Sequence, residues 1–411
     1  MGQRNKKRAA LTVLVAASAV LGYGAAAARA ETLALVGCKT YASPTAAPVV
    51  DAVIVASDGL ISAVGTQGTV QVPNDARIID CAGKTVVAGF WNSHVHFTGP
   101  LWINAMTASA AELEMNMQQM LTRWGFTTVW DLGSDPRNSL ALRRRVDTGE
   151  VAGPRILLTG NIFPRGGHPA YLPPQLQLPE AATPEEAVQM ARDDLQMGLD
   201  GMKLFTGSFM GTGRPVVNMD TAVAKAAVDV THRAGKPVFA HPQNRRGVDV
   251  VLDAGVNVLA HTVPTEPGYT VEQLARFKSQ GTALIPTLSL WTTVTSDPVA
   301  VARLTESGVS QLKAFAGNGG IVLFGTDVGF TSLYDTSVEF ELMQRAIPAS
   351  EVLASLTTSP AQYFGAGKKG RIEQGFDCDL VVLDADPSMD ARNLAKVAYT
   401  IRAGKLIYQK Q

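Results

Sequence analysis

The sequence has no excess of charge of either sign. Its 411 residues include 36 Lys and Arg side chains and 36 Asp and Glu side chains. Five of the basic residues lie in the first 30 positions, which contain no acidic residue, so the rest of the chain is slightly acidic. A protein that binds nucleic acid or another polyanion needs a basic surface. We therefore do not expect nucleic acid as a partner.

Cysteine is also scarce, with only Cys38, Cys81 and Cys378 in the chain. Their spacing matches neither a zinc knuckle nor a redox pair. We expect three buried free thiols that act as small apolar side chains. One disulfide is the alternative, because an exported chain permits it.

Long hydrophobic runs are missing beyond the N-terminus. Residues 1–8 carry four basic side chains, an apolar run covers residues 9–21, and small residues lead to Ala28-Arg29-Ala30. This pattern predicts a signal peptide, residues 1–30, that is cleaved after Ala30. An uncleaved membrane anchor is the alternative, but a span needs about 20 apolar residues. We expect a mature protein that is exported, most simply to a bacterial periplasm, and keeps no stable membrane anchor.

Short β-branched runs separated by turns occupy both ends of the chain. Residues 51–65 predict a hairpin around Asp58-Gly59, residues 76–89 predict a second around Gly83-Lys84, and Gly404 marks a turn in the last segment. Because chain termini often lie close together, we expect residues 31–89 and 366–411 to form one small β-sandwich domain.

Residues 90–365 alternate short apolar runs with stretches that carry helix start and stop signals. Thr183-Pro184 and the pair Thr270 and Gln273 are typical of helix starts. Eight apolar runs separated in this way predict an α/β fold, a (β/α)8 TIM barrel. The active site of such a barrel forms where the strands end.

Ionisable residues, most of them histidines, occupy those strand ends. Four of the six histidines in the chain lie there, together with one lysine and one aspartate. Four imidazoles and a carboxylate that converge on one point are typical ligands of zinc or a similar divalent ion. The residues are His94, His96, Lys203, His241, His261 and Asp327.

Lys203 does not fit such a site as an ordinary ammonium group, because metal ions would repel it. A buried lysine loses its proton easily, and the neutral amine reacts with carbon dioxide to give an anionic carbamate that bridges two metals. A salt bridge between Lys203 and a neighbouring carboxylate is the alternative.

The sequence resembles the amidohydrolase superfamily through residues 89–96 (GFWNSHVH), Lys203, His241, His261 and residues 325–327 (GTD). The resemblance covers nearly all of the chain after residue 30. Asn92-Ser93 replaces the acidic residue that the superfamily typically has before its H-x-H motif. The lysine favours the binuclear group that includes imidazolonepropionase-like and prolidase-like enzymes, because the mononuclear deaminases generally lack it.

The resemblance implies a role for each residue. His94, His96, carboxylated Lys203 and Asp327 would hold one metal, and His241, His261 and the same carbamate the second. A hydroxide shared by the metals would attack an amide or cyclic amide, with Asp327 as general base and then general acid.

Loops after the strands predict how the substrate is held. His168 is a candidate donor to the substrate carbonyl, with Tyr171 as an alternative and Arg214 as a candidate partner for a substrate carboxylate. The segment after Lys203 has no tyrosine, unlike some prolidase-like members. An N-acyl amino acid, a dipeptide or an aryl amide fits these side chains. A lactonase or phosphoesterase and a mononuclear deaminase are the alternative enzymes, and association into a homo-oligomer stays open.

Overall fold

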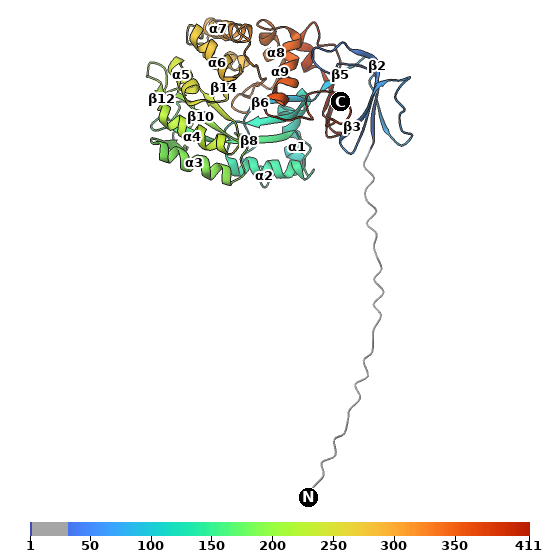
Figure 1. Ribbon diagram of the computed structural model, residues 1–411, viewed down its shortest axis with the longest axis horizontal. Helices are drawn as coiled ribbons and strands as arrows, with labels where there is room; N and C mark the ends of the chain where they lie inside the picture. Colours follow the sequence, from blue (N-terminus) through green and yellow to red (C-terminus); the bar gives the residue numbers. More distant parts are fainter. Residues whose placement is uncertain (2–31) are drawn as a thin grey trace.

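The computed structural model describes Met1 and residues 32–411. The predicted signal peptide, apart from Met1, and its cleavage point therefore lie outside the described residues. Strands and helices alternate in the middle of the chain, and strands from both ends form a separate sheet (Figure 1). The predicted fold class is confirmed, whereas the exact domain boundaries stay a prediction.

A parallel barrel forms the larger part of the molecule. Seven of its strands are hydrogen-bonded in the order β6-β7-β8-β10-β13-β14-β15. Their bounds are β6 (Phe90–Val95), β7 (Phe126–Asp131), β8 (Arg155–Pro164), β10 (Gly201–Phe205), β13 (Val238–His241), β14 (Val258–Ala260) and β15 (Ala283–Ile285).

The eighth apolar run, residues 321–327, closes the barrel as an extended segment with isolated bridges rather than as a regular strand. The Leu284 N–H donates to the Ile321 carbonyl at 2.9 Å, and the Ser93 N–H donates to the Phe324 carbonyl at 2.7 Å. Gly325 permits this close approach, because a Cβ there would lie 2.8 Å from the Cβ of His94. The barrel therefore closes between β15 and β6.

Helices surround the barrel, and their starts follow the predicted signals. The Thr183 hydroxyl accepts from the Glu186 N–H, and Thr270 and Gln273 form a capping box. The helices are α1 (Ala110–Met120), α2 (Pro136–Asp147), α3 (Pro184–Gln196), α4 (Thr221–Arg233), α5 (Arg245–Ala254), α6 (Val271–Gln280), α7 (Pro298–Gly317), α8 (Ser337–Gln344), α9 (Ala349–Leu356) and α10 (Thr358–Tyr363), with 3-10 turns η1 (Thr122–Trp124), η2 (Leu288–Thr292) and η3 (Ala391–Ala395). Three short strands are β9 (Glu180–Ala181), β11 (Gly207–Ser208) and β12 (Val217–Asn218).

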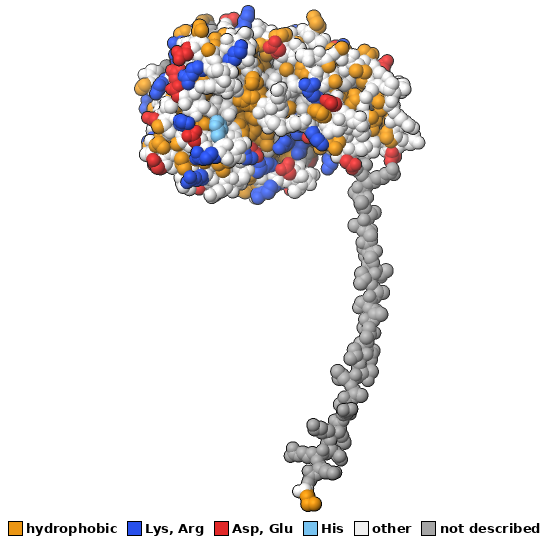
Figure 2. Space-filling model, in the orientation of Figure 1, with side chains coloured by type: hydrophobic (Ala, Val, Ile, Leu, Met, Phe, Trp, Pro, Cys, Tyr) orange, Lys and Arg blue, Asp and Glu red, His pale blue; other side chains and the backbone are white. Residues whose placement is uncertain are grey.

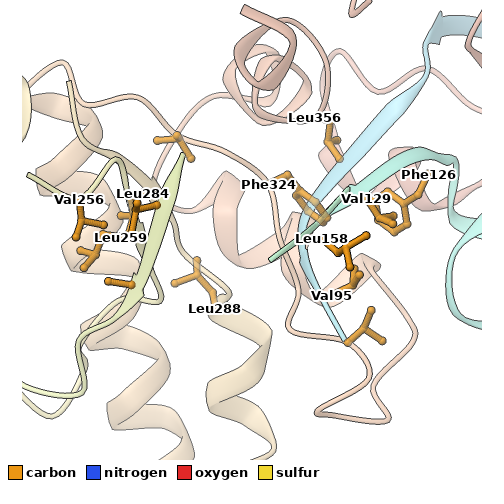
Figure 3. Close-up of a cluster of buried hydrophobic side chains, with 14 of the residues drawn as sticks. Val95, Phe126, Val129, Leu158, Val256, Leu259, Leu284, Leu288, Phe324 and Leu356 are labelled. Carbon is orange, nitrogen blue, oxygen red and sulfur yellow. The ribbon is translucent and has the colours of Figure 1, made fainter. Parts of the chain in front are cut away.

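Apolar side chains fill both sides of the barrel wall. Alternate strand residues pack against the surrounding helices, and Figure 3 shows part of this core. Inside the barrel, the rings of Trp130 and Phe239 lie 4.9 Å apart between centroids, and Phe364 lies 5.1 Å from Trp130. Because these rings occupy the interior, polar chemistry is left to the mouth where the strands end.

Strands from both chain ends make one sheet in the order β18-β17-β16-β5-β1-β2-β3, with β4 also paired to β1. Its strands are β1 (Leu33–Thr40), β2 (Val49–Ser57), β3 (Leu60–Thr66), β4 (Arg77–Asp80), β5 (Thr85–Ala88), β16 (Leu380–Leu383), β17 (Val397–Arg402) and β18 (Lys405–Gln409). The hairpin at Asp58-Gly59 is confirmed by the pairing of β2 with β3.

The predicted hairpin at Gly83-Lys84 is wrong. Both β4 and β5 run parallel to β1, where β4 pairs with residues 33–36 and β5 with residues 39–40. The turn at Gly83 therefore moves the chain along one edge of β1 instead of reversing it.

The three cysteines and the charged surface residues lie where the composition leads us to expect them. All three cysteines are free and buried. Basic and acidic side chains are interspersed on the face shown in Figure 2. Among the described residues, none of the helices is long and apolar enough to span a membrane.

Candidate metal centre

Three of the predicted ligands contact one another directly at the barrel mouth. The Nε2 atoms of His96 and His94 lie 2.9 and 3.1 Å from the same oxygen, Oδ1 of Asp327. His94 and His96 come from the end of β6, and Asp327 from the end of the closing segment. The Asp327 N–H also donates to the His94 carbonyl at 2.9 Å, which joins the two segments.

The other predicted ligands extend this cluster across the mouth. The His261 ring centroid lies 4.6 Å from that of His94 and 4.8 Å from that of His241. Nζ of Lys203 lies 3.4 Å from Nε2 of His94. Candidate ligand atoms of His94, His261 and Asp327 all lie within 4.8 Å of one another, which suits a metal ion. The structure thus brings all six residues together, while their roles as ligands stay a prediction.

Backbone strain concentrates at the same mouth. Residues with a side chain rarely adopt positive φ angles, yet φ is 75° at His261 and 60° at Asp327. Gln243 and Thr287, at φ 54° and 44°, add two more cases next to strand ends. Strain of this kind costs stability and is typical of functional sites.

Burial keeps three histidines of the cluster, His94, His241 and His261, neutral. It lowers the pKa of His94 to about 3 and that of His241 to about 4, and the nearby Lys203 ammonium acts in the same direction. Burial also holds the pKa of His261 well below its usual range. A neutral imidazole has a free nitrogen lone pair, which is the form that binds a metal.

The carboxylate and the lysine of the cluster carry unusual protonation states. Burial alone would raise the pKa of Asp327, but the electrostatic interaction with His94 and the hydrogen bonds with His94 and His96 hold it well below its usual range. Burial lowers the pKa of Lys203 to about 8. Lys203 is 1% exposed and forms no ion pair within the described part of the chain, which argues against the salt-bridge alternative.

His241 and His261 each have one ring nitrogen in hydrogen-bond contact with a polar side chain. Nε2 of His241 lies 2.9 Å from Oε1 of Gln243, and Nδ1 of His261 lies 2.7 Å from Oγ1 of Thr287. The opposite nitrogen of each ring is thereby left for another partner. Such outer contacts are typical of metal-binding histidines.

Aromatic side chains lie at the rim of the cluster. Tyr171 is 39% exposed and Phe330 is 45% exposed, and their rings meet edge to face at 5.1 Å. Desolvation and the charge of Asp327 both raise the pKa of Tyr171, so its hydroxyl stays protonated within electrostatic range of the cluster. The Phe205 ring stacks on Phe163 at 3.9 Å and lies 5.3 Å from the ring of His241.

His168 and Arg214, the other two predicted substrate-binding residues, make no direct contact with the cluster within the described part of the chain. The ring nitrogens of His168 each lie 3.2 Å from a backbone carbonyl oxygen, Nδ1 from that of Pro169 and Nε2 from that of Leu176. Arg214 is exposed in the loop between β11 and β12.

Comparison with known proteins agrees with this geometry. The sequence matches the amidohydrolase family over residues 85–407. The chain belongs to the amidohydrolase family. It is therefore an enzyme, a hydrolase of carbon–nitrogen bonds, and members of this family generally use metal ions.

Individual relatives of this amidohydrolase are distant. It is 24% identical to the allantoinase of Solibacter usitatus (strain Ellin6076), with 82% of each chain covered. The solved structure of a proposed prolidase from Bifidobacterium longum superimposes with a TM-score of 0.78 and 27% identity, covering 92% of this chain and 95% of that one. A Xaa-Pro dipeptidase with bound methionine matches in fold, at TM-score 0.78 and 22% identity over 92% of this chain and all of its own.

Sequence reasoning missed several side chains that hold the site of this amidohydrolase. Gln243 and Thr287 have no motif of their own, although each follows a strand end that the sequence did mark. Asn92, where the superfamily typically has an acid, donates from Nδ2 to the Thr326 hydroxyl at 2.8 Å and accepts from the His94 N–H at 3.2 Å. It therefore ties β6 to the closing segment.

Proposed function

We propose that this amidohydrolase is an exported enzyme that cleaves small amides or cyclic amides with the help of two divalent cations, zinc being the first choice. The observation that carries the proposal is the meeting of four imidazoles, Asp327 and a buried Lys203, which forms no ion pair with any described residue, at one barrel mouth.

The donor set fits such cations once Lys203 is carboxylated. The buried, partly neutral amine attacks carbon dioxide, forms an N–C bond and loses a proton, which converts an isolated cation into a bidentate anion. We assign His94, His96, Asp327 and the carbamate to one cation, and His241, His261 and the same carbamate to the other. The bound cations would supply Lewis acidity, which makes water acidic and polarises a carbonyl.

The residues of the chain supply the proton transfers. Asp327, an anion in its buried pocket, accepts the proton of the attacking water and delivers it to the leaving nitrogen as the C–N bond breaks. Tyr171 keeps its hydroxyl proton and would donate it in a hydrogen bond to the carbonyl oxygen. The ring nitrogens of His168 face loop carbonyls instead, so its role as donor needs a rotation of the ring.

The rim favours an amide with an apolar or aromatic group: an N-acyl amino acid, a dipeptide or an aryl amide. Tyr171 and Phe330 offer exposed ring surface beside Asp327, and dipeptides agree with the name of the similar Xaa-Pro dipeptidase. Arg214, exposed in a neighbouring loop, is the candidate partner of a substrate carboxylate.

Metal analysis and a substrate panel test the proposal on the purified chain from residue 31 onward. We expect about two metals per chain and hydrolysis of N-acyl amino acids, dipeptides or aryl amides that stops on chelation. Full activity after exhaustive chelation would disprove it. Turnover of lactones or phosphotriesters alone would favour the esterase alternatives, and ammonia release with one metal would favour a deaminase. N-terminal sequencing of the exported protein tests cleavage after Ala30.

A further inference from the structure

Glu339 is a buried carboxylate outside the six-residue cluster. It lies on α8, is 0% exposed, and forms no ion pair with any described residue. Its two oxygens accept hydrogen bonds from the backbone N–H groups of Leu288 and Ser289, at 2.9 and 2.6 Å. Burial raises its pKa to about 7 although these hydrogen bonds act the other way. A buried carboxylate without a cation is costly, so its retention calls for a role.

The two backbone N–H groups that donate hydrogen bonds to Glu339 lie at the start of η2. The residue before them, Thr287, occupies the N-cap position but makes no side-chain cap, and its φ is 44°. Positive φ is unfavourable for a β-branched residue. The carboxylate of Glu339 therefore replaces the missing cap and holds the strained turn from α8, a different element.

The hydroxyl of Thr287 is turned toward the metal-ligand cluster instead. Oγ1 donates to the Pro286 carbonyl at 2.9 Å and lies 2.7 Å from Nδ1 of His261. A hydroxyl has one hydrogen, and a Thr287 hydroxyl that donates to the Pro286 carbonyl accepts from Nδ1 of His261. In this arrangement Nδ1 carries the proton of the neutral ring, and Nε2 keeps its lone pair.

We propose that Glu339 is a positioning residue of the metal centre, which fixes the ring orientation and tautomer of His261 through the turn at Thr287. The chain of contacts runs from Glu339 to the Leu288 and Ser289 amides, and from Thr287 to His261. The inference rests on the proposed function in that His261 is taken to bind a metal through Nε2.

Four variants test the relay. Glu339→Gln replaces one acceptor oxygen with an NH₂ group that opposes a backbone N–H. Thr287→Val keeps the β-branched shape and removes the hydroxyl, while Thr287→Ser keeps the hydroxyl. Glu341→Gln is the matched control, because Glu341 is exposed on the same helix.

The first readout needs no metal. In metal-free protein with ¹⁵N-labelled histidine, assigned with a His261→Gln variant, we expect His261 to show a protonated Nδ1 and an unprotonated Nε2. Glu339→Gln and Thr287→Val should give a mixture of tautomers, and Thr287→Ser and Glu341→Gln the wild-type spectrum. A wild-type spectrum in folded Glu339→Gln would overturn the proposal, and so would one in Thr287→Val. If Glu339→Gln does not fold, the comparison of Thr287→Val with Thr287→Ser decides.

The second readout is zinc affinity, measured by competition with a chelator at pH 8. We expect Glu339→Gln and Thr287→Val to weaken the more loosely bound zinc about 10- to 100-fold, with Thr287→Ser and Glu341→Gln unchanged. Unchanged affinity in the first two variants would refute the positioning role. A wild-type chain that binds no zinc would instead refute the proposed function, and the tautomer measurement would still decide the relay.

Discussion

The two halves of the ligand cluster are built in different ways. In the Asp327 half (His94, His96 and Asp327), the side chains contact one another, with both Nε2 atoms on one carboxylate oxygen. In the Thr287 half (His241, His261, Gln243 and Thr287), each imidazole is held from behind by a neutral polar side chain. The Asp327 half is thus organised around a single anion. The Thr287 half depends on separate contacts, so a single substitution removes only one of them.

Replacing Asp327 tests the first half and should have the largest effect. Asp327→Asn removes the shared anion and the proposed proton carrier together, so we expect kcat/KM for amide substrates to fall by about 10³-fold or more. Steady-state kinetics on the active substrate measures this. Activity within tenfold of wild type would show that the half does not depend on Asp327.

Lys203 lies between the halves, so its loss should affect both. Lys203→Ala removes the proposed bridging carbamate, and we expect the metal content to fall sharply from about two per chain. Added short carboxylates should restore part of the activity, because they can occupy the vacated space. Metal analysis by mass spectrometry gives the result, and two metals retained in the variant would rule out the bridge.

Acid should destabilise the metal-free protein through both halves. The pKa values of His94 and His241 are about 3 and 4 in the folded chain, against an ordinary value of 6.5. Between about pH 4 and 6.5 the unfolded chain therefore binds more protons, so the free energy of unfolding rises with pH across this window and levels off above it. Urea unfolding at a series of pH values gives the slope. His241→Asn should reduce the slope, and a flat profile in wild type would contradict buried neutral histidines.

The smallest effect is expected for a single contact of the Thr287 half. Gln243→Met removes the acceptor at Nε2 of His241 while keeping side-chain size, and we expect zinc affinity to fall about tenfold. Gln243→Glu keeps an acceptor oxygen and serves as the control. If Gln243→Met lowered zinc affinity by as large a factor as Asp327→Asn lowers kcat/KM, the two halves would not differ in the way described.

Most of the site could be predicted from the residues at the strand ends. His94 and His96 alternate on one strand, and His241, His261 and Asp327 each end an apolar run, so barrel topology alone predicts that they meet. The contacts that hold them were not predictable in the same way. Thr287 and Gln243 act through left-handed backbone conformations that no local pattern marks.

Other features depended on long-range packing. Glu339 lies about 50 residues along the chain from the turn that it holds. In the sequence it is indistinguishable from any acidic residue in the first turn of a helix. The mistaken hairpin at Gly83 arose because a glycine turn between two β-branched runs fits a reversal and an advance along β1 equally well.

The sheet built from both chain ends has a consequence for how the molecule is made. β5 pairs with β16, and β17 and β18 complete that edge; the Thr400 hydroxyl also donates to the Thr122 carbonyl at 2.6 Å, next to the barrel. These last strands follow the barrel in the sequence, so β5 is made long before β16, its partner on one side. The sheet can therefore be completed only after the barrel segment between β5 and β16 has been made.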